Sequence, residues 1–376
     1  MTEMKNVRLI FAGGGTGGHL FPALAIADRV TELLKDKMNS EIIFIGTKRG
    51  IEYRMKDKLG YPLHIINMRG IVRSFTLKNL LVPFIIIAAL FKAHSLLKKF
   101  RPHIVIGTGG YVSWAILKAA ASKKIPVIIQ EQNSFPGVTT RQIAPVAQTI
   151  YLGFAGAEKY LKTTAEIKVV GNPVRKAIKK ISKNEACSTL NLDPDKTTIL
   201  ILGGSQGARS VNNAVLKSLE NNPLSEHYQL LWQTGKRDYK DVVEKLHERA
   251  KSLQLFPFAN SMTEIYSAAD IVIARAGALT IAEIINCGLP SLLIPYPFAA
   301  GDHQRKNAEE LVTGSMATMI LEDELKDKDI LQEAVSLHQS ESFNIMKESI
   351  KSHTKDKKEA VDCIAEDIIS QLEAVA

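Results

Sequence analysis

Cysteine is scarce in this sequence of 376 residues, which has only Cys187, Cys287 and Cys363. No two of them form a Cys-x-x-Cys pair, so the pattern argues against a disulfide scaffold and against a zinc site. The start of the chain also lacks an apolar run of signal-peptide length before its first glycines. These absences fit a reducing compartment, and we expect a cytoplasmic protein.

Acidic residues are absent from one long window, between Asp57 and Glu131. The formal net charge of the chain is +9 and this window alone holds eleven cations, so the rest of the chain is close to neutral. Such one-signed charge favours an anionic partner. We expect no nucleic acid, because the window has few aromatics to stack on bases and no helix-turn-helix or RNA-binding motif. The cations are Lys58, Arg69, Arg73, Lys78, Lys92, Lys98, Lys99, Arg101, Lys118, Lys123 and Lys124.

A run long enough to span a membrane is missing from this window. The apolar run LLVPFIIIAALF, residues 80–91, reaches about 18 Å as a helix, whereas a bilayer core needs roughly 20 residues. The run either forms a buried element of a parallel fold or lies on a membrane. We favour an anionic membrane surface, because each nearby Lys or Arg adds about 1 kcal/mol of attraction to acidic lipids. The expected contact patch is Leu80, Leu81, Phe84, Ile85 and Phe91.

Short β-rich runs alternate with longer helical stretches along the whole chain. This alternation predicts an α/β protein whose parallel sheets carry helices on both faces. The pattern restarts near residue 196, after the polar stretch 179–197, which we interpret as a connector between two domains. We expect strands at residues 7–12, 41–46, 62–67, 103–108, 126–131 and 148–153, and then at 197–204, 228–235, 253–259, 270–277, 290–297 and 316–321.

Glycine is concentrated in a loop at residues 13–18, between a predicted strand and a predicted helix. The loop matches the G-x-G-x-x-G fingerprint of dinucleotide sites. The next strand, 41–46, ends in GTKR with no acid for a ribose, so NADP is the dinucleotide that this pattern leaves open. His19 follows in the first helical turn, where the helix dipole favours the neutral imidazole that a general base needs. A hydrogen bond to a neighbouring loop is the alternative role for His19.

Further glycine-centred turns follow strands at residues 107–113, 131–137 and 203–207. In open parallel sheets ligands collect beyond the carboxyl ends of the strands, so these loops predict a surface for a bulky, phosphate-bearing ligand. Around Ala278 a strand gives way to a helix whose free amides can meet a diphosphate. Glu283 follows, either as an acceptor for ribose hydroxyls or as an acid placed favourably for the dipole.

Another helix is expected to begin at Asp302, His303 and Gln304, and capping of that helix explains Asp302. We expect no metal and no cofactor, because the Asp-Pro-Asp stretch at 193–195 is typical of a turn. A departing diphosphate would then be stabilised by helix N-termini and by cations such as Arg175.

Seven motifs, taken in order, resemble the MurG family of peptidoglycan glycosyltransferases. They are GGGTGGHLFPALAIA, GTGGYVS, EQNSFPG, GNPVR, GGSQGAR, RAGALTIAE and DHQRKNA, and they run over nearly the whole chain. The resemblance implies the GT-B fold, with two Rossmann-like domains that face a cleft. It also implies metal-independent, inverting transfer of GlcNAc from UDP-GlcNAc to the C4 hydroxyl of the muramoyl sugar of lipid I, an undecaprenyl diphosphate lipid, giving lipid II.

The same resemblance assigns roles to residues of this chain. His19 matches the candidate base, with the carboxylate of Glu131 left open as an alternative. Gln130 departs from the family, which often has histidine there, and a histidine contact with the acceptor is therefore not carried over. Gly14, Gly15, Gly109, Gly110 and Tyr111 form the expected acceptor and diphosphate loops. The expected UDP-GlcNAc site consists of Thr16, Gly17, Gly18, Asn133, Arg175, Ser205, Ala259, Ala278, Leu279, Thr280, Ile281, Ala282, Glu283 and Gln304.

The resemblance also implies a domain plan and a location. Residues 1–170 would form the acceptor and membrane domain, 171–344 the UDP-GlcNAc domain, and the helix from about 345 to 376 would pack back on the first domain. The protein would be peripheral on the cytoplasmic side of the cell membrane, with other cell-wall synthesis proteins as further partners. Other glycolipid synthases and sugar-nucleotide epimerases of this fold, and an NADP oxidoreductase, are the alternatives.

Overall fold

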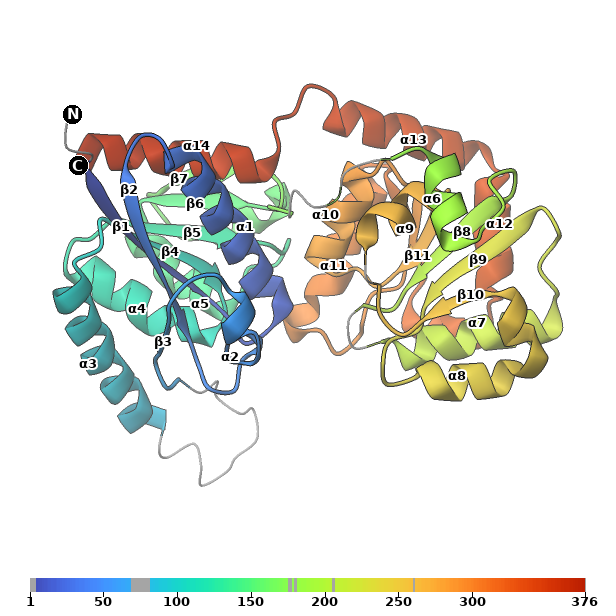
Figure 1. The fold of residues 1–376 in the computed structure, drawn as a ribbon, viewed down its shortest axis with the longest axis horizontal. Coiled ribbons are helices and arrows are strands. Elements are labelled where there is room, and N and C mark those ends of the chain that lie inside the picture. The colour runs from blue at the N-terminus through green and yellow to red at the C-terminus, as the bar shows by residue number, and fades with distance from the viewer. Residues whose placement is uncertain are drawn as a thin grey trace. The chain divides into compact units, whose positions relative to one another are not determined.

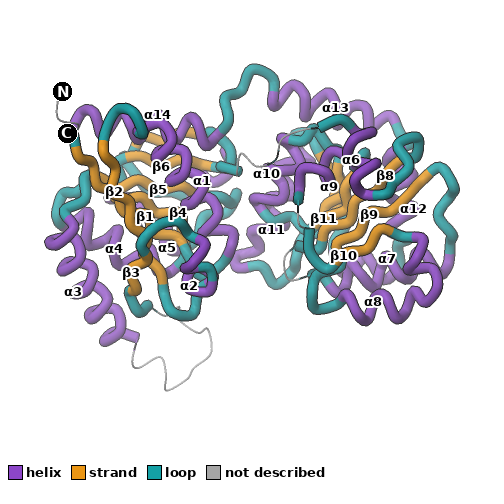
Figure 2. Tube along the Cα trace, viewed as in Figure 1, coloured by secondary structure: helices purple, strands orange, loops and turns teal. Residues whose placement is uncertain are grey.

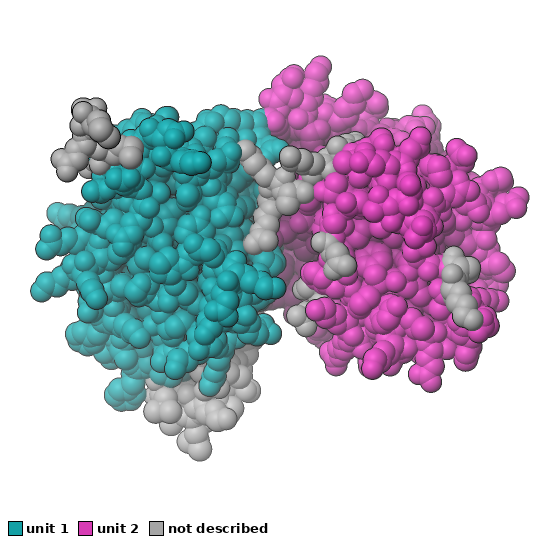
Figure 3. Space-filling model, in the orientation of Figure 1, with its two compact units in different colours: residues 1–175, 358–376 teal, residues 176–357 magenta. Residues whose placement is uncertain are grey.

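The computed structural model describes residues 5–68, 82–174, 178, 181–204, 207–259 and 261–375. The chain divides into two compact units (Figure 3). Unit 1 comprises residues 1–175 and 358–376, and unit 2 comprises residues 176–357. Seven residues named above lie outside the described residues, namely Arg69, Arg73, Lys78, Leu80, Leu81, Arg175 and Ser205.

The sheet of unit 1 has seven parallel strands in the order β3-β2-β1-β4-β5-β6-β7. In β1 the side chains of Leu9 and Phe11 enter one core cluster and those of Ile10 and Ala12 the other, as the two-residue period of a strand requires. The strands are β1 (Asn6–Gly13), β2 (Asn39–Gly46), β3 (Leu63–Ile65), β4 (Ile104–Gly109), β5 (Val127–Glu131), β6 (Thr149–Leu152) and β7 (Glu166–Val169).

Helices cover both faces of this sheet (Figure 1). The core cluster on one face includes α1 and α14, and the cluster on the other face includes α3, α4 and α5. The elements are α1 (Gly17–Leu34), α2 (Ile51–Arg54), η1 (Lys56–Lys58), α3 (Val82–Phe100), α4 (Tyr111–Ser122), α5 (Val138–Ile143), η3 (Ala144–Val146), η4 (Ala155–Tyr160) and α14 (Ala360–Val375).

The sheet of unit 2 has six parallel strands in the order β10-β9-β8-β11-β12-β13. Helices again flank the strands on both faces (Figure 2). Trp232 of β9 is fully buried in a core cluster with α7, α8 and α12. The strands are β8 (Thr197–Leu202), β9 (Tyr228–Gln233), β10 (Gln254–Phe256), β11 (Ile271–Ala274), β12 (Ser291–Leu293) and β13 (Ala317–Met319).

The helices of unit 2 begin inside the stretch that the sequence pattern marks as a connector. There, the hydroxyl of Ser182 accepts the N–H of Glu185 and caps α6, which buries Ala186 and Cys187 and packs on α9. This part of the stretch is therefore an element of unit 2. The helices are α6 (Lys183–Leu190), α7 (Arg209–Asn221), α8 (Tyr239–Leu246), η5 (His247–Ser252), α9 (Met262–Ala268), α10 (Ala278–Asn286), η6 (Ala300–Asp302), α11 (His303–Thr313), η7 (Glu322–Lys326), α12 (Ile330–His338) and α13 (Glu341–Thr354).

The structure confirms the predicted fold class of two parallel-sheet, Rossmann-like units. Each of the twelve predicted runs contains a strand, and one strand, β7, was not predicted. The apolar run that begins at residue 80 is helical over its described part. A buried element was one reading of that run, but within it only Val82 and Ala89 are buried, while Phe84, Ile87 and Phe91 are exposed.

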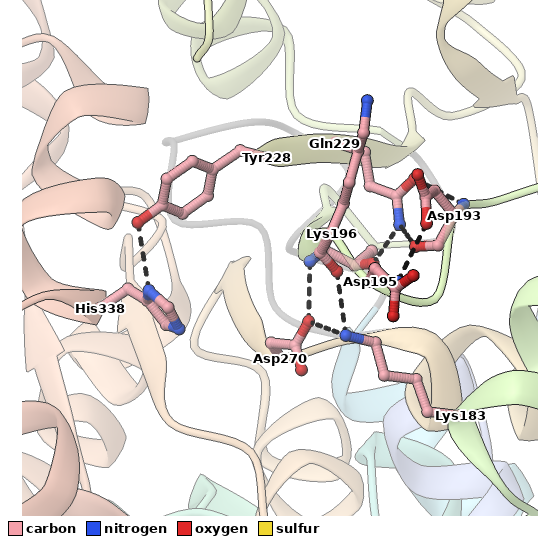
Figure 4. A network of polar contacts seen from close by, with 9 residues as sticks. Lys183, Asp193, Asp195, Lys196, Tyr228, Gln229, Asp270 and His338 are labelled. Atoms are coloured by element: carbon pink, nitrogen blue, oxygen red, sulfur yellow. Dashed lines mark hydrogen bonds and ion pairs between the residues drawn. The ribbon is translucent and has the colours of Figure 1, made fainter. Parts of the chain in front are cut away.

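A polar network holds the amino ends of the unit 2 strands (Figure 4). Asp270, directly before β11, accepts the backbone N–H of Thr198 and the ammonium of Lys183, both at 2.8 Å. Tyr228 at the start of β9 pairs with His338 at 3.1 Å. These contacts lie at the opposite edge of the sheet from the glycine-centred loops and serve the fold.

The C-terminal helix α14 completes the core of unit 1. Its side chains Ile364, Ala365, Ile368 and Leu372 are fully buried in the cluster that contains α1. Polar contacts join it near its start and at its middle, since Asp362 pairs with Arg29 at 2.5 Å and Asp367 pairs with Lys168 at 2.7 Å. The chain returns to unit 1 at residue 358, after α13, which belongs to unit 2.

We predict that Ile368→Ala lowers the free energy of unfolding by about 2–5 kcal/mol, because it leaves a cavity between α14 and α1. Urea unfolding of the full chain measures the change. Ile345→Ala in α13 is the control, because this isoleucine is 50% exposed and its loss should cost within about 0.5 kcal/mol. Equal effects of the two substitutions would contradict the role of α14.

Candidate active site

Three loops meet at the carboxyl edge of the unit 1 sheet. They follow β1, β4 and β5, which are neighbours in the sheet, so their ends lie side by side. The contact between them is close: a Cβ added to Gly110 would lie 2.5 Å from the carbonyl oxygen of Gly14. Gly110 has φ +79° and Gly109 has φ +99°, a backbone region that favours glycine. Gly15 also lies beside the ring of Tyr111.

His19 stands in the first turn of α1, with its side chain half-buried among these loops. Its Nδ1 lies 3.1 Å from the carbonyl oxygen of Thr108 and 3.0 Å from Oε1 of Gln132. Both partners are acceptors, so Nδ1 carries the hydrogen and a neutral ring keeps its lone pair on Nε2. The loop contact that the sequence left open is therefore present, and it is compatible with a base that acts through Nε2.

A buried carboxylate that sequence reasoning missed holds the glycine-rich loop. Glu52 of α2 is fully buried and accepts the N–H of Gly15 at 2.8 Å, the N–H of Thr47 at 2.8 Å and the hydroxyl of Thr47 at 3.3 Å. The amide of Gly15 is thus already used, and the negative charge opposes a phosphate at this point. This arrangement disfavours the hypothesis that the loop binds a dinucleotide. The signal in the sequence was an acid six residues beyond the strand 41–46.

Glu131 shapes the third loop. One carboxylate oxygen accepts the backbone N–H of Asn133 at 3.0 Å and its side-chain amide at 3.3 Å. The other accepts the N–H of Gly137 at 3.0 Å and the hydroxyl of Thr140 at 2.5 Å. Four donors therefore occupy the carboxylate, which favours His19 over Glu131 as the candidate base.

Gln130, the position that departs from the family, is fully buried at the end of β5. Its side chain contacts those of Gln132 and Asn172. In this chain the residue therefore lies behind the loops and supports them.

In unit 2 the helix α10 begins at Ala278, as the sequence predicts, and Gly277 is its N-cap. Leu279, Thr280 and Ala282 are half-buried, and Ala278 and Ile281 are buried. The first-turn amides of this helix point beyond the carboxyl end of β11, where an anion is favoured.

Glu283 lies further along α10 and is half-buried. Its Oε2 accepts the hydroxyl of Tyr266 at 2.8 Å. Burial raises the pKa of Glu283, and the hydrogen bond from Tyr266 opposes that rise. The carboxylate is thus held by one tyrosine and has acceptor capacity left for other hydroxyls.

Arg275 is a second residue that sequence reasoning missed. One guanidinium nitrogen donates to the carbonyls of Ile294 and Pro295 at 3.2 and 3.1 Å, and the other donates to Ser210 at 2.8 Å and pairs with Glu322. The guanidinium also lies 5.5 Å from the ring centroid of Tyr296. Arg275 therefore ties the loop that follows β12 to the end of β11.

That loop positions Gln304, because the backbone N–H of Tyr296 donates to Oε1 of Gln304 at 2.9 Å. Gln304 stands in the first turn of α11. Asp302 precedes this helix as expected, but the capping prediction is wrong. Its φ of +57° is left-handed and its side chain makes no cap hydrogen bond, because the turn η6 enters the helix through that backbone conformation.

The loops after β8 and β10 are joined by Gln233. Its side chain accepts the N–H of Ala259 at 3.0 Å and donates to the carbonyl of Gly204 at 3.3 Å. Because the amide of Ala259 is used, a uracil contact by this backbone would use the carbonyl oxygen.

Acidic residues do not gather into a metal-like cluster in the described part of the chain, where no group of three His, Cys, Asp or Glu could hold an ion. The Asp-Pro-Asp stretch forms the predicted turn, in which the N–H of Asp195 donates to the carboxylate of Asp193 at 3.0 Å (Figure 4).

Comparisons with known proteins cover almost the whole chain. The model of the glycosyltransferase family 28 N-terminal domain matches residues 9–152, and that of the C-terminal domain matches residues 198–364. The UDP-N-acetylglucosamine--N-acetylmuramyl-(pentapeptide) pyrophosphoryl-undecaprenol N-acetylglucosamine transferase of Chlorobium limicola is 41% identical over 88% of this chain and 89% of its own length. The protein of that name from Caldanaerobacter subterraneus is 36% identical over 93% of this chain and 96% of its own.

A solved structure agrees with these relatives. The crystal structure of Acinetobacter baumannii MurG has a TM-score of 0.76 and 25% identity, and the match covers 97% of this chain and 99% of that one. Two Rossmann-like units with glycosyltransferase family 28 domains define a glycosyltransferase of the GT-B fold. Within that class, the chain belongs to the MurG family.

We predict that Glu283→Gln raises the free energy of unfolding, relative to wild type, more at pH 7 than at pH 4. Burial raises the pKa of Glu283 in the folded state, so the native protein loses stability as the pH rises and the carboxyl ionises. The amide removes this loss and can still accept the hydroxyl of Tyr266. Chemical unfolding at both pH values measures the effect.

The control for this experiment is Glu220→Gln, an exposed carboxylate of α7. It removes the same charge from a solvated position. If both variants changed stability equally with pH, burial of Glu283 would not be the cause.

Proposed function

We propose that this protein transfers N-acetylglucosamine from UDP-GlcNAc to the C4 hydroxyl of the muramoyl sugar of lipid I, giving lipid II for peptidoglycan synthesis. The activity for which its relatives are named supports these substrates. The observation that carries the chemistry is the position of His19, whose Nδ1 faces two acceptors so that a neutral ring presents a lone pair on Nε2.

In the proposed reaction, Nε2 of His19 takes the proton of the acceptor hydroxyl. The hydroxyl oxygen attacks C1 of GlcNAc from the face opposite UDP, the C1–O bond to the diphosphate breaks, and the anomeric centre inverts. The electron pair leaves with UDP, whose charge the N-terminus of α10 would stabilise without a metal. Arg175, which is not among the described residues, would also stabilise the departing diphosphate.

The donor would use the loops of unit 2. Glu283 would accept two ribose hydroxyls, the run from Ala278 to Ala282 would meet the diphosphate, and Gln304 would contact the sugar. Ser205 is a further expected contact of UDP-GlcNAc, and the backbone of Ala259 would meet the uracil. In unit 1, Thr16, Gly17, Gly18 and Asn133 stay expected contacts of the donor, and Gly14, Gly15, Gly109, Gly110 and Tyr111 would line the acceptor side.

We predict that His19→Ala lowers kcat by about 10²-fold or more, because the acceptor proton loses its base. The assay supplies UDP-GlcNAc and a lipid I analogue and measures UDP and the disaccharide lipid. His64→Ala, at an exposed position of β3, is the matched control and should be near wild type.

Three further arms test the alternatives. Full activity with EDTA supports the metal-free reaction, and loss of activity with EDTA would refute it. Conversion of UDP-GlcNAc without any lipid would indicate an epimerase. Tighter binding of NADPH than of UDP would indicate an oxidoreductase.

For the location, we propose a peripheral enzyme on the cytoplasmic face of the cell membrane. None of the described helices is long and apolar enough to cross a bilayer. Helix α3 exposes Phe84 (68%), Ile87 (51%) and Phe91 (74%) at helical spacing, with Ile85 half-buried beside them. Exposed Lys92, Lys98 and Lys99 follow on the same helix, so apolar surface and positive charge occur together. Other cell-wall proteins stay an expected class of partner.

We predict that the protein floats with anionic vesicles more than with neutral ones, and that salt reduces the difference. Phe84→Glu with Phe91→Glu should abolish most of this binding. The matched control is Ile345→Glu, which alters an exposed apolar side chain of α13 in unit 2. Equal recovery with both kinds of vesicle, or equal loss in both variants, would contradict the proposal.

A further inference from the structure

Three buried amide side chains stand behind His19. Gln130 lies near the end of β5, Gln132 directly follows that strand, and Asn172 comes from the segment after β7. Their exposed fractions are 0%, 2% and 6%. A buried amide keeps its place only when its donors and acceptors are matched, so the orientation of each one carries information.

The surroundings of Gln132 fix which way its amide points. Its Nε2 lies 2.8 Å from the carbonyl oxygen of Thr108, 3.1 Å from the carbonyl oxygen of Gln130, and within hydrogen-bond distance of Oε1 of Gln130. An oxygen at that position would face three oxygens. The nitrogen must therefore stay there, and Oε1 must face Nδ1 of His19.

The other two amides lock this orientation. Nε2 of Gln130 donates to Oδ1 of Asn172 at 3.1 Å, which leaves Oε1 of Gln130 to accept from Gln132. The amide nitrogen of Asn172 donates to the backbone carbonyl of Gln132 at 2.9 Å. Each amide thus has one orientation that matches the others. If one amide were reversed, its oxygen would face an oxygen of its neighbour, or its nitrogen a nitrogen.

We propose that Gln132, locked by Gln130 and Asn172, is a positioning residue that holds His19 in the Nδ1–H tautomer and directs the Nε2 lone pair toward the acceptor hydroxyl. The inference rests on the proposed role of His19 as base. These three side chains are uncharged amides, so they fix the tautomer without placing a carboxylate beside the imidazole. The buried Gln130 has its use here, because it accepts from Gln132 and donates to Asn172.

The test combines a measurement on His19 itself with a measurement of rate. Nitrogen-15 NMR of histidine-labelled full-length protein, with the signal assigned by its loss in His19→Ala, identifies the tautomer. Wild type should show Nδ1–H alone. In Gln132→Leu a second tautomer should appear, kcat should fall at least about tenfold, and KM should stay within about twofold.

Two variants separate positioning from folding. Gln130→His can accept from Gln132 with one ring nitrogen and donate to Asn172 with the other, so it should keep the Nδ1–H tautomer and most of kcat. Gln130→Leu leaves Gln132 in place but removes the side-chain amide that locks it, so the second tautomer should appear in part even if Gln132→Leu does not fold. The signal of exposed His64 should be unchanged throughout.

The outcomes distinguish this inference from the proposed function. An Nε2–H tautomer in wild type, or a single Nδ1–H tautomer with unchanged kcat in Gln132→Leu, would overturn the positioning role. Full activity of His19→Ala would instead refute the base, whatever the tautomer of the ring.

Discussion

The candidate site depends on buried polar groups whose partners are the backbone amides of loops. Glu52 binds the N–H groups of Gly15 and Thr47, and Glu131 binds those of Asn133 and Gly137. A glycine-rich loop has many accessible conformations, and a buried carboxylate that accepts several N–H groups selects one of them, because leaving it unpaired would be costly. The ring of His19 can be placed accurately because the loops beside it are held in this way.

Much of the fold could be predicted from the sequence. Parallel strands buried on both faces are continuous β-branched runs, and such runs mark the strands of both sheets. Strand β7 was not predicted because its hydrophobic pattern is weak. It lies at the sheet edge, where it pairs with β6, and Glu166 and Val169 are exposed. The start of α10 at Ala278 was predicted because a glycine separates a buried strand from an apolar helix.

Contacts between distant residues were beyond sequence reasoning. Glu52 lies 37 residues from Gly15, and Gln132 lies 113 residues from His19, so neither pairing leaves a local pattern. Arg275 lies in the predicted strand 270–277, but no local pattern indicates that its guanidinium donates to the carbonyls of Ile294 and Pro295. Asp302 failed as a cap because residue type predicts capping only where the backbone is extended, and here it is left-handed.

The return of the chain to unit 1 has a consequence for the order of events during synthesis. The ribosome completes the whole of unit 2 before it makes α14, so the apolar face of α1 that binds Ile364 and Ile368 stays uncovered until α14 emerges. Domains that are continuous in sequence can fold as they appear. Unit 1 cannot be finished in this way, so its folding waits until residues 358–376 have been made, and a nascent chain that lacks them would carry an exposed apolar surface for chaperones to protect.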